Sequence, residues 1–338
     1  MDAWRQLVDG VAELALEAAM ETCHTLEVGA GEIIMEAGSL DPALTYVLAG
    51  EVEVRRGGVQ LAVCGPGQIL GEMGMFREAP RMAEVVTTVP TRALVLTRAG
   101  YDALVESNNP VIYRLERQAL EQLGQRLRRM DGLVSARSEG EDDPFRKPPR
   151  GFFAQVRDLL LGEPAPEIRP RGVDKVGLVE QSHLFRGERF ALVQGLAELL
   201  EPEAFAAGEV ICGQGEPGGP IHLVAEGTAR VVVHVAPGRI HQLGTVGRGA
   251  CVGMTALVDG RPRMASVVAL EQVDTLALSH RRYRSLVARD GQIPSALRRA
   301  MIRAFANQLE EAGAALVAIA RGTLPGAVSA VATEIYGR

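Results

Sequence analysis

An internal repeat constrains the fold of this chain more than any other feature. The tetrapeptide Pro-Arg-Met-Ala occurs at 80–83 and again at 262–265, each time after an apolar segment and before a Val-rich one. Upstream of it, three glycines recur 177 positions later, as the pairs Gly31 and Gly208, Gly38 and Gly215, and Gly50 and Gly227. This period is far longer than that of a solenoid repeat, so the chain is predicted to contain a duplicated domain.

Each copy has the pattern of a small β-structure with helices beside it. Short Val, Ile and Leu runs end at glycines, and Val52 and Val54 alternate with charged residues, as in a strand with one buried face. Apolar residues at helical spacing follow each copy: Ile112, Leu115, Ala119, Leu123, Leu127, Met130 and Val134 in the first, and Leu297, Met301, Phe305, Leu309, Ala312, Leu316 and Ile319 in the second. We therefore predict a mainly β fold class with flanking helices: two tandem jelly-roll β-barrels, each followed by a long helix.

The repeat and a proline-rich segment divide the chain into four regions. The predicted domains are 1–135 and 176–322, joined by a linker at 136–175 and followed by a tail at 323–338. The linker has an acidic start and six prolines between 138 and 172, which disfavour a sheet. Within it, the segment 151–161 is predicted to form a short helix that packs on its own domain, with a docking motif for another protein as the alternative. Before the first barrel, Leu7, Val11, Leu14 and Ala18 also keep helical spacing.

Composition limits the classes of partner. The 338 residues are 47% hydrophobic and carry a net charge of −6, so no overall basic field favours DNA or anionic lipid. The cysteines Cys23, Cys64, Cys212 and Cys251 are widely separated and are interpreted as reduced thiols of a cytoplasmic protein. Neither an export signal nor a membrane span is expected. The chain lacks a nucleophile motif and a metal-ligand pattern, so we expect no enzymatic activity, no catalytic residue and no metal.

The stretch from Leu70 to Ala83, here called the first cassette, carries residues suited to a phosphorylated ribose. Gly71 permits a close backbone approach, and Arg81 offers a planar guanidinium that can bind a phosphate with two hydrogen bonds. Glu72 can accept a hydrogen bond from a hydroxyl beside that phosphate. The combination indicates a site for a phosphorylated ribose.

Both copies resemble cyclic nucleotide-binding domains, the jelly-roll modules of catabolite activator proteins and of kinase regulatory subunits. The family's cassette, F-G-E-L-A-L-x(4)-P-R-x-A, appears here as L-G-E-M-G-M-FREA-P-R-M-A. The resemblance implies that Arg81 binds the cyclic phosphate and Glu72 the ribose hydroxyl. The implied ligand-binding set is Gly71, Glu72, Met73, Gly74, Pro80, Arg81, Met82 and Ala83. The expected ligand is a cyclic nucleotide, with cAMP expected ahead of cGMP. In the family, the residue at the position of Met82 helps to distinguish adenine from guanine nucleotides, and a methionine there indicates neither base.

The second cassette, Val252 to Ala265, departs from the pattern at one position. Met254 replaces the ribose-binding glutamate, whereas Arg263 is retained. A buried arginine without a phosphate needs another partner. A possible second site therefore comprises Gly253, Thr255, Ala256, Arg263, Met264 and Ala265.

These observations predict a regulatory or sensor protein that binds a cyclic nucleotide in the first domain and signals through a protein partner. The alternative is a ligand-free scaffold that uses the same fold for assembly. The apolar stripe from Ile112 to Val134 predicts a homodimer with one long helix from each chain at the contact. The alternative for the stripe is that the second domain covers it within one chain.

Overall fold

The computed structural model describes residues 2–77, 79–139, 168–182, 184–185, 188–236 and 239–320. The described residues form two compact units. The first consists of Met1–Arg126 together with Val287–Arg321, and the second is built on Leu127–Leu286. Each unit contains one copy of the sequence repeat.

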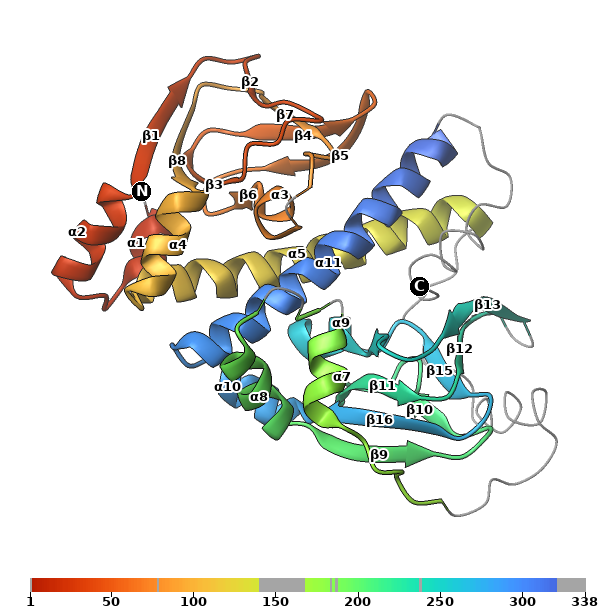
Figure 1. Ribbon diagram of the computed structural model, residues 1–338. Coiled ribbons are helices and arrows are strands. Elements are labelled where there is room, and N and C mark those ends of the chain that lie inside the picture. Colours follow the sequence, from red (N-terminus) through yellow and green to blue (C-terminus); the bar gives the residue numbers. More distant parts are fainter. Residues whose placement is uncertain are drawn as a thin grey trace. The chain divides into compact units, whose positions relative to one another are not determined.

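The first unit contains two four-stranded antiparallel sheets (Figure 1). The first sheet has the order β1-β8-β3-β6, with the bounds Cys23–Val28, Thr91–Thr97, Ala43–Ala49 and Ile69–Leu70. The second sheet has the order β2-β7-β4-β5, with the bounds Ile33–Met35, Glu84–Thr87, Val52–Arg56 and Val59–Cys64. Buried side chains from both sheets form the core between them, namely Met35, Val47, Val52, Cys64, Leu70 and Val85.

The second unit repeats these sheets strand for strand. One sheet has the order β9-β16-β11-β14, with the bounds Glu201–Phe205, Val273–Leu278, Ile221–Glu226 and Cys251–Val252. The other has the order β10-β15-β12-β13, with the bounds Val210–Cys212, Ser266–Ala269, Ala229–Ala236 and Arg239–Val246. The predicted fold class, two tandem β modules with helices, is confirmed.

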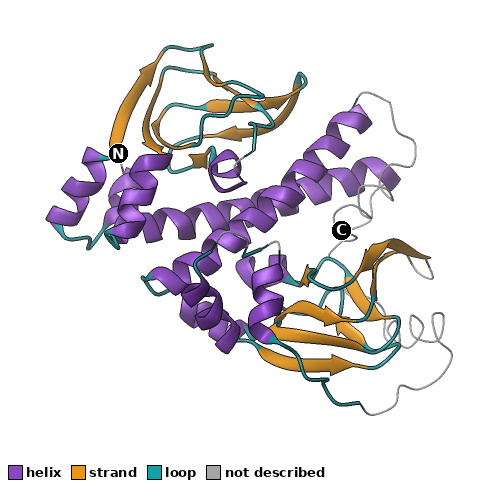
Figure 2. Cartoon of the chain, viewed as in Figure 1, coloured by secondary structure: helices purple, strands orange, loops and turns teal. Residues whose placement is uncertain are grey.

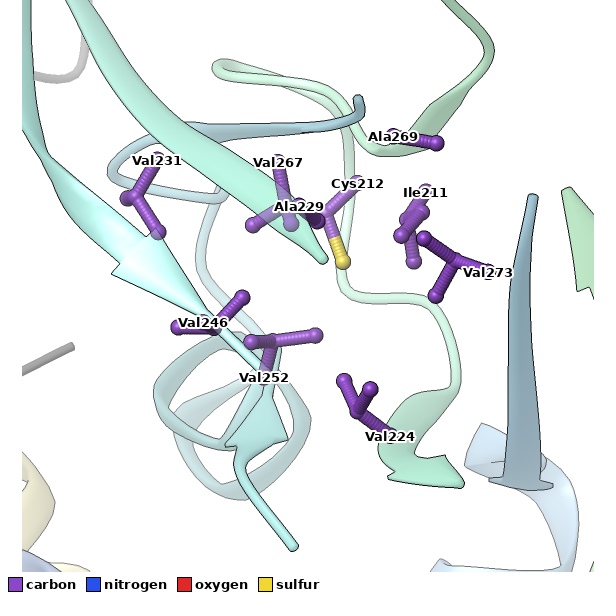
Figure 3. Close-up of a cluster of buried hydrophobic side chains, with 10 residues drawn as sticks. All are labelled: Ile211, Cys212, Val224, Ala229, Val231, Val246, Val252, Val267, Ala269 and Val273. Atoms are coloured by element: carbon purple, nitrogen blue, oxygen red, sulfur yellow. The ribbon is translucent and has the colours of Figure 1, made fainter. Parts of the chain in front are cut away.

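The core of the second module is built from small branched residues (Figure 3). Val224, Val231 and Val273 are fully buried among seven further side chains, and burying a valine contributes about 1.5–3 kcal/mol relative to leaving it exposed. Cys212 lies in the same cluster, and burial raises the pKa of its thiol to about 11. All four cysteines are free, as the sequence indicates.

Helices flank both modules (Figure 2). In the first unit they are α1 (Asp2–Val8), α2 (Glu13–Glu21), α3 (Glu72–Arg77), α4 (Arg98–Glu106), the greater part of α5 (Pro110–Glu139) and α11 (Gln292–Ala320). Those of the second unit are α7 (Lys175–Gln181), α8 (Phe190–Glu198), α9 (Met254–Asp259) and α10 (His280–Val287). The linker segment 151–161 lies outside the described residues. No described helix combines the length and the hydropathy that a bilayer crossing requires.

The N-terminal segment with helical spacing forms two helices, α1 and α2, and not one continuous helix. The chain breaks into two helices because Gly10 adopts a φ of 71°, a conformation that ends a helix. Leu14 on the second of these helices is 78% exposed. Helical spacing alone therefore placed this leucine on a buried face that it does not occupy.

Helix α11, which follows the second barrel in sequence, packs against the first module. It contacts α3, and the carboxylate of Glu310 pairs with Arg77. Arg56 also donates a hydrogen bond of 2.9 Å to the carbonyl of Glu310. The predicted stripe of α11 is buried at Leu297, Met301, Phe305, Leu309 and Ala312.

The stripe of α5 is covered within its own chain over its described side chains. Ile112, Leu115, Ala119, Leu123 and Leu127 are all buried, while the side chains of Met130 and Val134 lie outside the described set. Over residues 112–127 the stripe is therefore buried within one chain, and cover by the second domain stays a prediction. No unpartnered apolar strip remains there to require a second chain.

Candidate functional site

The first cassette begins at a sharp turn between β6 and α3. Gly71 has a φ of 82°, and a Cβ atom at this position would lie 2.2 Å from the carbonyl oxygen of Ala43. Only glycine fits this turn, because a side chain would clash with backbone as well as strain it. The same virtual Cβ would lie 2.9 Å from Nη1 of Arg81. The guanidinium therefore lies against the turn that opens the cassette.

Arg81 is held in place by the loop between β2 and β3. Its backbone N–H donates to Ser39, and its side chain donates to the carbonyl of Asp41 (2.6 Å) and to Sδ of Met35 (3.1 Å). The Asp41 carboxylate lies 3.8 Å from the guanidinium. Burial lowers the pKa of Arg81, and the carboxylates of Asp41 and Glu72 oppose that effect. A buried, fixed guanidinium beside a glycine turn is suited to binding a phosphate.

Glu72 is buried and already has a partner. Its side chain is 3% exposed, and Oε1 accepts a hydrogen bond of 2.7 Å from Nη1 of Arg126 on α5. Arg126 also donates to the carbonyl of Ile69 at 2.6 Å. The helix after the barrel thus orients the carboxylate that the sequence assigns to the ribose. Sequence analysis missed Arg126, because nothing in the cassette pattern reaches 54 residues along the chain.

The remaining predicted residues line the same short segment. Gly74 and Ala83 are buried, Met73 and Met82 are partly buried, and Pro80 is exposed. The carbonyl of Arg81 accepts from the N–H of Gly38 at 2.7 Å, so one of the repeated glycines anchors the end of the cassette. The structure thus brings the predicted set together around α3.

The second cassette has the same backbone. Gly253 has a φ of 86°, α9 spans six residues like α3, and Gly215 donates to the carbonyl of Arg263 at 2.8 Å. Of the other predicted residues, Ala256 is buried, while Thr255, Met264 and Ala265 are partly buried. Met254 is 5% exposed and places a thioether where the first cassette has Glu72.

A buried histidine lies beside the second cassette. His222 on β11 pairs with Val252, next to Gly253, and its Nδ1 lies 3.2 Å from Oγ1 of Thr275. Burial, followed by the charge of Arg263, lowers the pKa of His222 to about 4. The contact of 3.6 Å with Glu203 therefore involves a neutral imidazole at neutral pH.

His222 should make the second unit sensitive to acid. The pKa of His222 in the folded state lies below the unfolded value of about 6.5, so protonation favours the unfolded state. The contribution of His222 to the free energy of unfolding is therefore complete above pH 6.5, and about 3 kcal/mol of it is lost as the pH falls to 4. His222→Thr, which introduces the residue found at the matching Thr45 of the first module, should flatten this loss. Denaturant unfolding of both proteins between pH 7 and 4 measures it. The pKa of Glu203 is raised by burial and acts in the opposite direction in both proteins. If the free energy of unfolding of the two proteins fell equally with pH, His222 would not be the source of the acid sensitivity.

No group of three His, Cys, Asp or Glu side chains within the described ranges is arranged to hold a metal ion. What the two cassettes offer is a guanidinium in each and a carboxylate in the first.

The chain belongs to the cyclic nucleotide-binding domain family, whose model matches residues 25–108 and 202–290. It is 24% identical over 272 residues to cGMP-dependent protein kinase, isozyme 1, of Drosophila melanogaster, covering 79% of this chain and 28% of that protein. It is 32% identical over 132 residues to the cAMP-dependent protein kinase regulatory subunit of Dictyostelium discoideum, covering 38% of each. The chain thus spans less than half the length of either relative.

Among solved structures, the chain matches the regulatory domain of Toxoplasma gondii PKA crystallised with cAMP. The match has 19% identity and a TM-score of 0.32 over 88% of this chain and 92% of that one. Because the family model matches the chain twice, the chain is a tandem member of the cyclic nucleotide-binding family, as the repeat indicates.

Proposed function

We propose that the first cassette binds a cyclic nucleotide and that the chain is a regulatory protein. Arg81 binds the cyclic phosphate, and Glu72 accepts a hydrogen bond from the ribose 2′-hydroxyl. The backbone at Gly71 and Gly74 closes on the same groups, with Met73, Pro80, Met82 and Ala83 completing the segment. cAMP is proposed ahead of cGMP.

The observation that carries this proposal is the position of two buried charged groups around one glycine. The guanidinium of Arg81 lies against Gly71, and the next residue, Glu72, is buried with its carboxylate fixed by Arg126. A phosphate with an adjacent hydroxyl presents the complementary groups, an anion for the guanidinium and a hydrogen-bond donor for the carboxylate. Preorganised groups of this kind lose little freedom on binding, which favours affinity.

The proposed output is contact with a protein partner. The relatives named above are a cyclic-nucleotide-dependent kinase and a kinase regulatory subunit, which supports a protein kinase as the class of partner. We propose no catalysis by this chain, no DNA binding and no membrane attachment, and a cytoplasmic location. The homodimer also stays a prediction, and light scattering tests it. Since the stripe is buried within the chain from Ile112 to Leu127, a dimer contact would have to lie outside that part of α5.

One observation favours the alternative of a ligand-free scaffold. Glu72 and Arg81 already have partners within the chain, so the fold does not require a ligand at the first cassette. A ligand must compete with Arg126 for the Glu72 carboxylate or share it.

A thermal-shift panel of cyclic mono- and dinucleotides separates the two functions. A ligand that binds only the folded state stabilises it by RT ln(1 + [L]/Kd), about 2.7 kcal/mol at a hundredfold excess over Kd. We expect cAMP to raise the unfolding midpoint more than cGMP, and linear AMP to serve as the matched control with little effect. A panel without any stabilising member supports the scaffold.

A further inference from the structure

Arg263 is a buried cation for which the described part of the chain provides no ion-pair partner. Arg263 is only 5% exposed, and its Nη2 donates a hydrogen bond of 2.7 Å to the carbonyl of Pro220. Nη1 is buried, and no described residue accepts a hydrogen bond from it. A buried charge without a partner is costly, whereas its cost falls when an anion is bound.

Comparison with Arg81 shows what is missing. The two arginines share the same backbone bonds, and Ala43 and Pro220 offer equivalent carbonyls. Arg81 has the Asp41 carboxylate at 3.8 Å, but Gly218 occupies the matching position in the second copy.

The chain cannot readily replace the missing carboxylate at position 218. A Cβ atom on Gly218 would lie 2.4 Å from the carbonyl oxygen of Ala256, so a side chain there would clash with the backbone of α9. The other acidic position is also lost, because Met254 stands where Glu72 does. Both carboxylates that surround Arg81 are therefore absent around Arg263.

The unpartnered Nη1 lies at the turn that opens the second cassette. A Cβ atom on Gly253 would come within 2.2 Å of it, which is the same relation that Gly71 has to Arg81. The positive charge also acts on its surroundings: burial raises the pKa of Cys212 and Arg263 opposes that rise, while burial lowers the pKa of His222 and Arg263 adds to that fall. The second cassette thus offers a cationic donor at the phosphate position and no acceptor at the hydroxyl position.

We propose that the second cassette binds a phosphate group through Arg263 and recognises it without the neighbouring hydroxyl. Its ligands are cyclic nucleotides with or without a ribose 2′-hydroxyl, and inorganic phosphate. The nucleotide part rests on the proposed function, whereas the phosphate part does not. The two modules then differ in specificity: Glu72 makes the first selective for ribose, and Met254 makes the second indifferent to it.

The experiment uses full-length variants in which one cassette is disabled. In Arg81→Ala only the second cassette keeps its arginine, and in Arg263→Ala only the first cassette does. Calorimetric titration of each with cAMP and with 2′-deoxy-cAMP gives the ratio of the two affinities. We expect a ratio within about twofold for Arg81→Ala. For Arg263→Ala we expect a preference of about tenfold or more for cAMP, because one charge-assisted hydrogen bond is lost with the deoxy ligand.

Inorganic phosphate tests the anion site independently of any nucleotide. It should raise the unfolding midpoint of Arg81→Ala, and the double variant Arg81→Ala/Arg263→Ala should lose this increase. If Arg263→Ala does not fold, Met254→Glu replaces it: the added carboxylate should weaken phosphate binding and create a preference for ribose in the second cassette of Arg81→Ala.

Two results would overturn the inference. One is a strong preference of Arg81→Ala for cAMP over 2′-deoxy-cAMP. The other is that neither nucleotide nor phosphate acts on Arg81→Ala. If no variant binds a nucleotide while phosphate still raises the unfolding midpoint in an Arg263-dependent way, the proposed function is wrong and the anion site at Arg263 is supported.

Discussion

Replacing Arg81 by alanine should weaken cyclic nucleotide binding at the first cassette about 100-fold or more. In the proposed complex the guanidinium makes two charge-assisted hydrogen bonds to the phosphate, and losing them costs a few kcal/mol. Isothermal titration calorimetry of the Arg263→Ala background isolates the first cassette and gives the dissociation constant before and after the change. The fold should survive with a loss of about 1–3 kcal/mol, since the carbonyl of Asp41 loses its donor.

Arg77→Ala is the matched control for this prediction. Arg77 lies on the same helix α3, but its guanidinium pairs with Glu310 instead of lying at Gly71. Its replacement should leave nucleotide affinity within about twofold of the parent. Equal affinities for Arg81→Ala and its parent would place the ligand elsewhere. Equal losses in the Arg77 and Arg81 variants would indicate a general effect on α3.

Much of the module could be predicted because its determinants are local. The cassette spacing brought Gly71, Glu72 and Arg81 together correctly, since the turn, the short helix and the arginine follow one another along the chain. The repeated glycines predicted a duplicated domain, and the two units indeed have equivalent strand orders, with turns of positive φ at these glycines. Val52 lies in the core as its alternation with charged residues indicated.

The partners of these residues could not be predicted, because they depend on long-range packing. Arg126 reaches Glu72 from the following helix, and Asp41 reaches Arg81 from a loop 40 residues earlier. The apolar stripe of α11 predicts that one face of this helix is buried, but it does not identify the surface that covers it. The packing of α11 on the first module was therefore not predicted. The lack of a described acceptor for Nη1 of Arg263 likewise depends on the side chains packed around it, which the retained cassette spacing does not specify.

A buried ion pair joins α11 to α5. Glu116 on α5 and Arg298 on α11 are 1% and 0% exposed, with Nε of Arg298 3.0 Å from Oε2 of Glu116. Glu116 also accepts hydrogen bonds of 2.7 Å from Tyr101 and from Ser295. Arg298 donates to the carbonyls of Val287 and Arg289 and lies over the ring of Tyr113. One carboxylate therefore joins three helices of the first unit.

Glu116→Leu should destabilise the first unit by about 3–5 kcal/mol, because it leaves Arg298 buried without a counter-charge. Denaturant unfolding of the full chain measures the loss, and hydrogen exchange should show reduced protection along residues 292–312. Asp102→Ala is the control: its ion pair with Arg98 is exposed and should contribute about 1 kcal/mol or less. The double replacement Glu116→Leu/Arg298→Met should recover part of the loss, because it removes the orphaned charge together with its partner. A single variant as stable as the parent, with unchanged exchange in α11, would mean that apolar packing alone holds this helix on the first module.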